Sequence, residues 1–240
     1  MEEFYMGIKK CIENTTKEIF SKKIIVEFVS NVSARAKEIT EIDSQRWSNV
    51  YESKKFTGYF VHETENHCSY ILIDSNRSHE DMLITAYHEM KHMIDFYMFL
   101  KIFDGDMNKM INSNINKTFN IYSEYEAVMF GYVHFLKMCL LDKDKKYKTK
   151  LLIRKTKLIY EDMEQIENKY QFLIHSIQYF GVLMACKEFD DFFDFDKEIA
   201  EMDSILELIP IFNMLKNTSK IRNYEWFVDF DSKCRKYIGE

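Results

Sequence analysis

The sequence has few residues that would interrupt a compact fold. It contains one proline, Pro210, and six glycines among 240 residues, while 46% of its residues are hydrophobic. Such a composition leaves little room for linkers or disordered segments. We therefore expect a compact, mostly helical protein, either one large domain or a catalytic domain with a helical companion.

Paired cysteines are also absent. The sequence contains five cysteines, an odd number, and none of them forms a CxxC pair. They are Cys11, Cys68, Cys139, Cys186 and Cys234. Neither a disulfide framework nor a thiolate zinc site is indicated, so we expect reduced and mostly buried thiols.

Long apolar runs and excess positive charge are lacking as well. No run approaches the roughly 18 apolar residues that a membrane span needs. The first twenty residues lack the basic start and the unbroken apolar stretch of a signal peptide. We therefore expect a soluble cytoplasmic protein without a membrane partner. The net charge of -6 would repel phosphate backbones, so direct binding of nucleic acid is not expected.

A small sheet is predicted before the first strong helix. Residues 56–62 (FTGYFVH) and 68–74 (CSYILID) are rich in aromatic and β-branched side chains and predict a β-hairpin. A further strand is expected over 23–30, which makes a sheet of about three strands. Ser78 precedes Asp81 by three residues, a capping-box-like start that predicts a helix beginning here.

The rest of the chain has a helical pattern. The first helix is expected to run to about Phe103. Residues 104–120 are polar and asparagine-rich, which predicts a loop that could include a turn of helix. Further helices are predicted over 122–141, 146–187, 194–216 and 222–238, with Pro210 bending or breaking the third of these.

The chemistry is concentrated in His88-Glu89-Met90-Lys91-His92, inside the first strong helix. Residues four apart share one face of a helix, so His88 and His92 can bind one ion while Glu89 lies beside them. Zinc held by neutral imidazoles lowers the pKa of its water toward about 7, and a nearby carboxylate accepts the proton. The motif therefore predicts a catalytic Zn²⁺ site with Glu89 as the general base. Lys91 is a departure, because zincin helices usually have an uncharged residue there.

A third ligand must come from outside this motif, because the third histidine of the metzincin pattern is absent. The second strong helix offers Glu124 and Glu126. These two side chains differ by about 200° in direction, so only one of them can face the metal. We favour Glu124, with Glu126 as the rival. A His₂Glu site leaves the fourth position open for water.

These segments together resemble the ImmA/IrrE metallopeptidases, in which a β-hairpin and an HExxH helix precede a helix with the pattern ExEAxxFA. Here HEMKH is followed by EYEAVMFG over residues 124–131, with Gly131 in place of the last alanine. The resemblance covers about residues 56–136. Family members usually have Asn or Asp where Val128 stands, as a partner that orients a zinc histidine. Asp95 is a candidate substitute for that partner.

The resemblance implies an α+β fold with a zincin-like metallopeptidase domain, which we place at residues 1–142, followed by a helical region at 143–240. The expected function is zinc-dependent cleavage of a peptide bond in a protein substrate, with a transcriptional repressor of a mobile element or stress response as one candidate. The alternative is an inactive zincin-like regulatory or interaction protein, which Lys91 and Val128 favour. The oligomeric state does not follow from the sequence.

The sequence does not select one group that would stabilise an oxyanion. Tyr122, Tyr132 and His134 lie in the right part of the sequence for that role.

Overall fold

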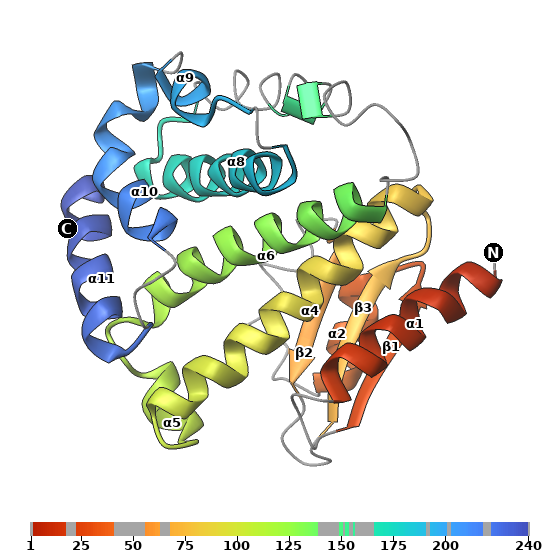
Figure 1. Cartoon of the computed structure of the whole chain (residues 1–240). Coiled ribbons are helices and arrows are strands. Elements are labelled where there is room, and N and C mark those ends of the chain that lie inside the picture. The colour runs from red at the N-terminus through yellow and green to blue at the C-terminus, as the bar shows by residue number, and fades with distance from the viewer. Residues whose placement is uncertain are drawn as a thin grey trace. The chain divides into compact units, whose positions relative to one another are not determined.

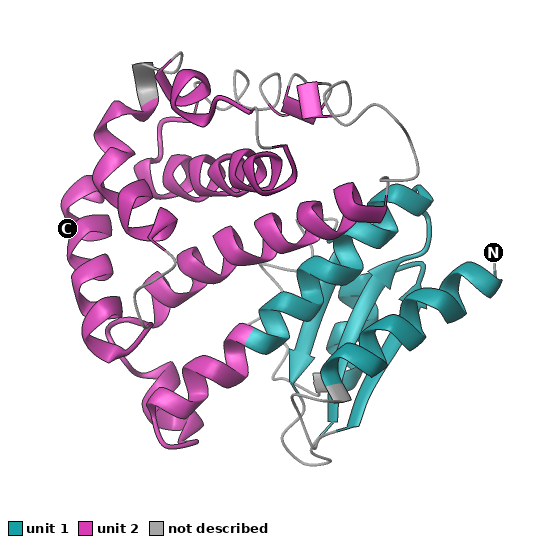
Figure 2. Ribbon diagram, in the orientation of Figure 1, with its two compact units in different colours: residues 1–94 teal, residues 95–240 magenta. Residues whose placement is uncertain are grey.

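The computed structural model shows a mostly helical α+β chain with one three-stranded mixed sheet. It describes residues 2–17, 23–40, 56–62, 68–138, 149–150, 152–153, 156, 166–190, 193–200, 203–217 and 222–239. The chain divides into two compact units, residues 1–94 and residues 95–240 (Figure 2). Each unit has a buried apolar cluster of its own.

The first unit contains the sheet (Figure 1). Its strands are β1 (Lys23–Val29), β2 (Gly58–His62) and β3 (Cys68–Asp74), in the order β1-β3-β2. Strands β2 and β3 pair antiparallel, which confirms the pairing that the hairpin prediction required, and β1 pairs parallel with β3. Strand β2 is therefore an edge strand of the mixed sheet.

Helices cover both faces of this sheet. They are α1 (Glu2–Lys17), α2 (Val32–Thr40) and the first part of α4 (His79–Ile102). Leu72 of β3 shares a buried cluster with Val32 of α2. On the opposite face Gly58 lies against α4, and Tyr5 of α1 stacks on Phe28 of β1 with ring centroids 4.2 Å apart. The motif helix therefore packs on the sheet face that α2 does not cover.

The described elements of the second unit are all helices. After the end of α4 it contains α5 (Met107–Ile111), α6 (Asn116–Met138), α8 (Lys169–Phe189), α9 (Phe195–Ala200), a 3₁₀ helix (Asp203–Leu208), α10 (Ile209–Lys216) and α11 (Tyr224–Ile238). Its core is aromatic: Phe99 stacks on Phe119 at 3.9 Å and Phe180 on Phe212 at 4.2 Å. Large rings of this kind bury much apolar area. They hold α6, which carries both candidate glutamates, in a packed helical core.

The region predicted as a loop with a possible turn of helix over 104–120 contains the short helix α5, which agrees with that prediction, but from Asn116 it is already helical, and the loop prediction is wrong there. Asp106 caps α5, and its Oδ1 accepts a hydrogen bond from the backbone N–H of Lys109 at 3.0 Å. Helix α6 begins at Asn116. The polar residues that suggested a loop serve instead as caps and as exposed helix faces.

The C-terminal predictions are met in part. Asn168 caps α8 and residues 166–168 are not helical, so the single helix predicted over 146–187 is wrong. Pro210 lies in the first turn of α10, where its missing N–H costs nothing, so the predicted break is confirmed. The boundary predicted between 142 and 143 lies outside the described residues, and that division remains a prediction.

Four of the cysteines lie within the described residues, as free thiols. Cys186 and Cys234 are buried, Cys68 is partly buried and Cys11 is exposed, whereas Cys139 lies outside the described residues. None of the helices in the described segments has the length and apolar character needed to cross a membrane.

Candidate metal centre

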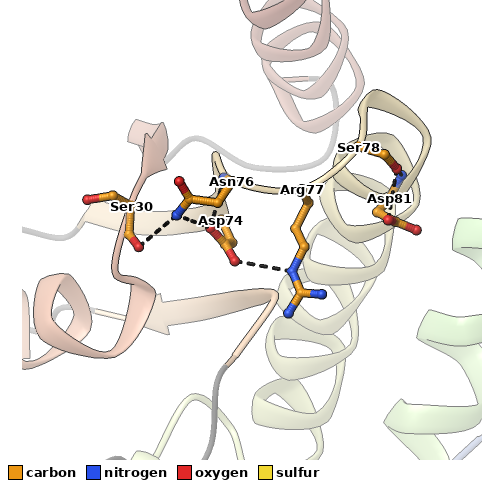
Figure 3. Close-up of polar contacts among 6 residues, drawn as sticks. All are labelled: Ser30, Asp74, Asn76, Arg77, Ser78 and Asp81. Carbon is orange, nitrogen blue, oxygen red and sulfur yellow. Dashed lines mark hydrogen bonds and ion pairs between the residues drawn. The ribbon is translucent and has the colours of Figure 1, made fainter.

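A hydrogen-bonded turn joins the end of β3 to the start of α4 (Figure 3). The carboxylate of Asp74 accepts hydrogen bonds from the backbone N–H of Asn76 at 2.9 Å and from Arg77 Nε at 3.2 Å. The side-chain amide of Asn76 donates to the carbonyl of Ser30, just after β1, at 3.1 Å. The ends of two strands are thereby tied to the turn that introduces the motif helix.

Ser78 caps α4. Its Oγ accepts a hydrogen bond from the backbone N–H of Asp81 at 3.1 Å and donates to the Asp81 carboxylate at 2.8 Å (Figure 3). This confirms the predicted start of the helix, because a capped N-terminus satisfies a backbone donor that otherwise has no partner. Glu80 and Asp81 add negative charge in the first turn, where the helix dipole favours it. The HEMKH motif thus lies well inside a long, capped helix.

His88 and His92 point their Nε2 atoms at one another. The two nitrogens lie 2.9 Å apart, and the ring planes are inclined at 85° with centroids 4.5 Å apart. Burial, together with the positive charge of Lys91, lowers the pKa of His92 to about 4. A neutral imidazole is the form that binds metal, so His92 needs no deprotonation near neutral pH.

The two imidazoles fit a zinc ion. Nitrogens bound at about 2.0–2.1 Å to a tetrahedral ion lie roughly 3.3 Å apart. The observed 2.9 Å between the two Nε2 atoms is close to that value, so small side-chain rotations would open the pair to an ion. Two imidazoles and a carboxylate are also a donor set that catalytic zinc sites use.

Glu89 lies against the edge strand β2 and is 7% exposed. A Cβ atom on Gly58 would come within 2.3 Å of Thr85 Cγ2, 2.9 Å of Glu89 Cγ and 3.1 Å of Glu89 Oε1. The absence of a side chain at Gly58 therefore provides the room that the carboxylate occupies. The side chain of Glu89 therefore extends from α4 toward Gly58, the first residue of β2.

Glu124 and Glu126 lie in different surroundings on α6. Glu124 is half-buried, and its Oε2 accepts a hydrogen bond from Gln178 Nε2 of α8 at 2.9 Å. Glu126 lies near Tyr122: burial raises the pKa of this tyrosine, and the negative charges of Glu126 and Asp95 raise it further. The two carboxylates diverge, as their spacing on a helix requires.

Residues of α4 and α6 that belong to the second unit meet in antiparallel order. The Ser123 hydroxyl donates to Asp95 Oδ2 at 3.5 Å, and the ring of Phe99 stacks on that of Phe119. Residue numbers rise along α4 as they fall along α6. Asp95 lies one turn beyond His92 in the same unbroken helix.

A group of three potential metal ligands is present among the described residues. One ligand atom from each of His88, His92 and Glu124 lies within 4.8 Å of the other two. Glu126, the rival ligand, is not part of this group. The chain therefore has a His/His/Glu group at metal-binding distance.

The tyrosines and the histidine considered for oxyanion stabilisation are not part of this group. The ring of Tyr122 contacts that of Trp226 edge-on, with centroids 5.5 Å apart. His134 Nδ1 lies 2.9 Å from the carbonyl oxygen of Phe130, and Tyr132 packs against the core of the second unit. Their assignment to that role stays a prediction.

The two positions considered for orienting a zinc histidine also have defined surroundings. Val128 is buried, and its side chain packs against Gly181 of α8. Asp95 is 2% exposed and accepts the hydrogen bond from Ser123. Position 128 therefore contributes apolar packing between two helices.

Sequence reasoning did not single out Gly58, Gln178 or Gly181. Glycine inside a strand often marks a close approach of another segment, so Gly58 had a recognisable signal. Gln178 and Gly181 lie more than fifty residues from Glu124 and Val128, and nothing local in the sequence indicates that these pairs meet.

No protein-family model, curated protein or solved structure matches the chain.

Proposed function

We propose that this chain is a zinc-dependent endopeptidase of the ImmA/IrrE type, with a zincin-like fold around the sheet and the motif helix. The observation that carries the proposal is the group of His88, His92 and Glu124, whose ligand atoms lie within 4.8 Å of one another, with the buried Glu89 next to His88 in the same helix. The burial of Glu89 supports its assignment as the general base rather than as an ordinary surface acid.

His88, His92 and Glu124 are the proposed ligands, and their spacing supports that assignment. When bound, a zinc ion supplies Lewis-acid activation of water and of the peptide carbonyl. Glu89 takes the proton from the attacking water and passes it to the leaving amine nitrogen. Glycine at position 58 keeps the space around this carboxylate free of a neighbouring side chain.

The proposed substrate is a peptide bond in another protein. The likeness to ImmA/IrrE metallopeptidases suggests a transcriptional repressor of a mobile element or a stress response. Direct contact with nucleic acid is not part of the proposal, because the net charge of -6 disfavours it.

Cleavage of a quenched peptide library by the zinc-loaded protein tests the proposal, with Glu89→Gln as the matched control. We expect wild type to cleave, and Glu89→Gln to bind zinc normally while its cleavage rate falls by about 10²-fold or more. Equal rates in the two proteins would remove Glu89 from the mechanism. A zinc-loaded wild type that cleaves neither peptides nor unfolded proteins would favour the inactive regulatory alternative.

A further inference from the structure

Helices α6 and α8 come unusually close at Gly181. A Cβ atom on this residue would lie 2.9 Å from the backbone oxygen of Tyr125 and 3.2 Å from Val128 Cβ. The backbone oxygen cannot rotate away as a side chain can, so any larger residue at this position would separate the helices. Gly181 therefore sets how closely α8 approaches the segment of α6 that carries both glutamates.

Gln178 precedes Gly181 by one helical turn and lies on the same face of α8. Glu124 likewise precedes Val128 by one turn on α6. The close approach at Gly181 thus places the Gln178 amide beside the Glu124 carboxylate, and Nε2 donates to Oε2 at 2.9 Å. Both side chains are half-buried, where a hydrogen bond is less weakened by water.

The chemistry of this hydrogen bond suits a metal ligand. An ionised carboxylate only accepts hydrogen bonds, and the glutamine amide contributes a donor without adding charge. A hydrogen bond to Oε2 restricts rotation of the carboxylate. Partners of this kind orient metal ligands, and their loss typically weakens metal binding by about 10- to 100-fold.

We infer that Gln178 is a positioning residue for Glu124, so that the helical region after α6 contributes directly to the metal centre. The inference rests on the proposed function, because it takes Glu124 as the third ligand. It also explains how a polar interaction can support the ligands although position 128, where the resemblance implies such a partner, is a valine packed on Gly181.

The test is zinc affinity, measured by competition with a chelator, for wild type, Gln178→Leu and Gln178→Glu. Leucine keeps the apolar bulk without the donor, and glutamate keeps the length but sets a second carboxylate beside Glu124. Gln171→Leu is the matched control, because Gln171 is an exposed glutamine on the same helix. The stability of the metal-free proteins is measured alongside by unfolding. A contact that serves only the fold would change this stability but not the zinc affinity.

We expect both Gln178 variants to bind zinc about 10- to 100-fold more weakly than wild type, with Gln171→Leu unchanged. If Gln178→Leu fails to fold, Gln178→Glu carries the same comparison. Variants that are less stable without metal but bind zinc as wild type does would overturn the positioning role while leaving the proposed function intact. A wild type that binds no zinc would overturn both.

Discussion

Gly58 is a glycine in an edge strand, where a β-branched or aromatic residue would ordinarily be favoured. The space it leaves is filled by Thr85 and Glu89 of the motif helix. Only close packing of α4 on the sheet gives this glycine a role, and that packing also positions the proposed base. The sequence shows the glycine but not the partner that requires it.

We expect Gly58→Ala to destabilise the protein by about 1–3 kcal/mol, because the new methyl group overlaps Thr85 and presses on Glu89. Urea unfolding of the metal-free protein measures this change. Gly7→Ala is the control: a Cβ atom added to Gly7 in α1 would meet no neighbouring atom within 4 Å, so alanine should stabilise by about 0.5–1 kcal/mol. A Gly58→Ala variant that is as stable as wild type in urea would contradict the close packing of β2 on α4.

The cysteines offer a second test at this scale. Burial, with the negative charges nearby, raises the pKa of Cys186 and of Cys234 to about 12. Both thiols are thus protonated and inaccessible in the folded protein, whereas Cys11 is exposed.

In a thiol-titration experiment on the native protein at about pH 8, Cys11→Ser should remove one fast-reacting thiol. Cys186→Ser and Cys234→Ser should leave the number of fast-reacting thiols unchanged and lower it only after unfolding. Rapid modification of Cys186 or Cys234 in the native protein would show that the core of the second unit opens readily.

At the scale of single elements, local signals explain which predictions succeeded. The hairpin, the Ser78 cap and the motif helix depend on neighbouring residues, and the sequence predicts all three. Helix α5 was expected only as a turn within a loop, because the segment around it is polar and its start depends on one capping carboxylate, Asp106. Short helices of this kind have little periodicity, so composition alone resembles a loop.

The cap of α5 should make a small part of the stability depend on pH. The hydrogen bond from the Lys109 N–H lowers the pKa of Asp106. A carboxyl with a lowered folded-state pKa stabilises the fold above its unfolded pKa of about 3.9, and the effect is lost as the pH falls through the folded value.

Unfolding of wild type, Asp106→Ala and Asp106→Asn at about pH 7 and about pH 3 tests this. The stability difference between wild type and Asp106→Ala should narrow at the lower pH. Asparagine caps without a charge, so the difference between Asp106→Asn and Asp106→Ala should not change. A wild-type advantage over alanine that stays constant would show that the ionised carboxylate contributes nothing.

At the scale of the whole molecule, the sequence predicts the class of fold and the metal-binding motif but not the long-range contacts. His88, Glu89 and His92 form a local pattern, and the following helix offers two glutamates. The Gln178 hydrogen bond and the close approach at Gly181 join segments far apart in the chain, and no periodicity or motif encodes them. The part of the proposed site that sequence reasoning missed is thus its support rather than its ligands.

The central claim is that His88, His92 and Glu124 bind one zinc ion. Elemental analysis of purified wild type and four alanine variants, at positions His88, Glu124, Glu126 and His79, tests it most directly. His79 is an exposed histidine at the start of the same helix and serves as the control. We predict about one zinc per chain in wild type, His79→Ala and Glu126→Ala, and its loss from His88→Ala and Glu124→Ala. Absence of metal from wild type even after zinc is supplied, or its loss from Glu126→Ala but not from Glu124→Ala, would contradict the claim.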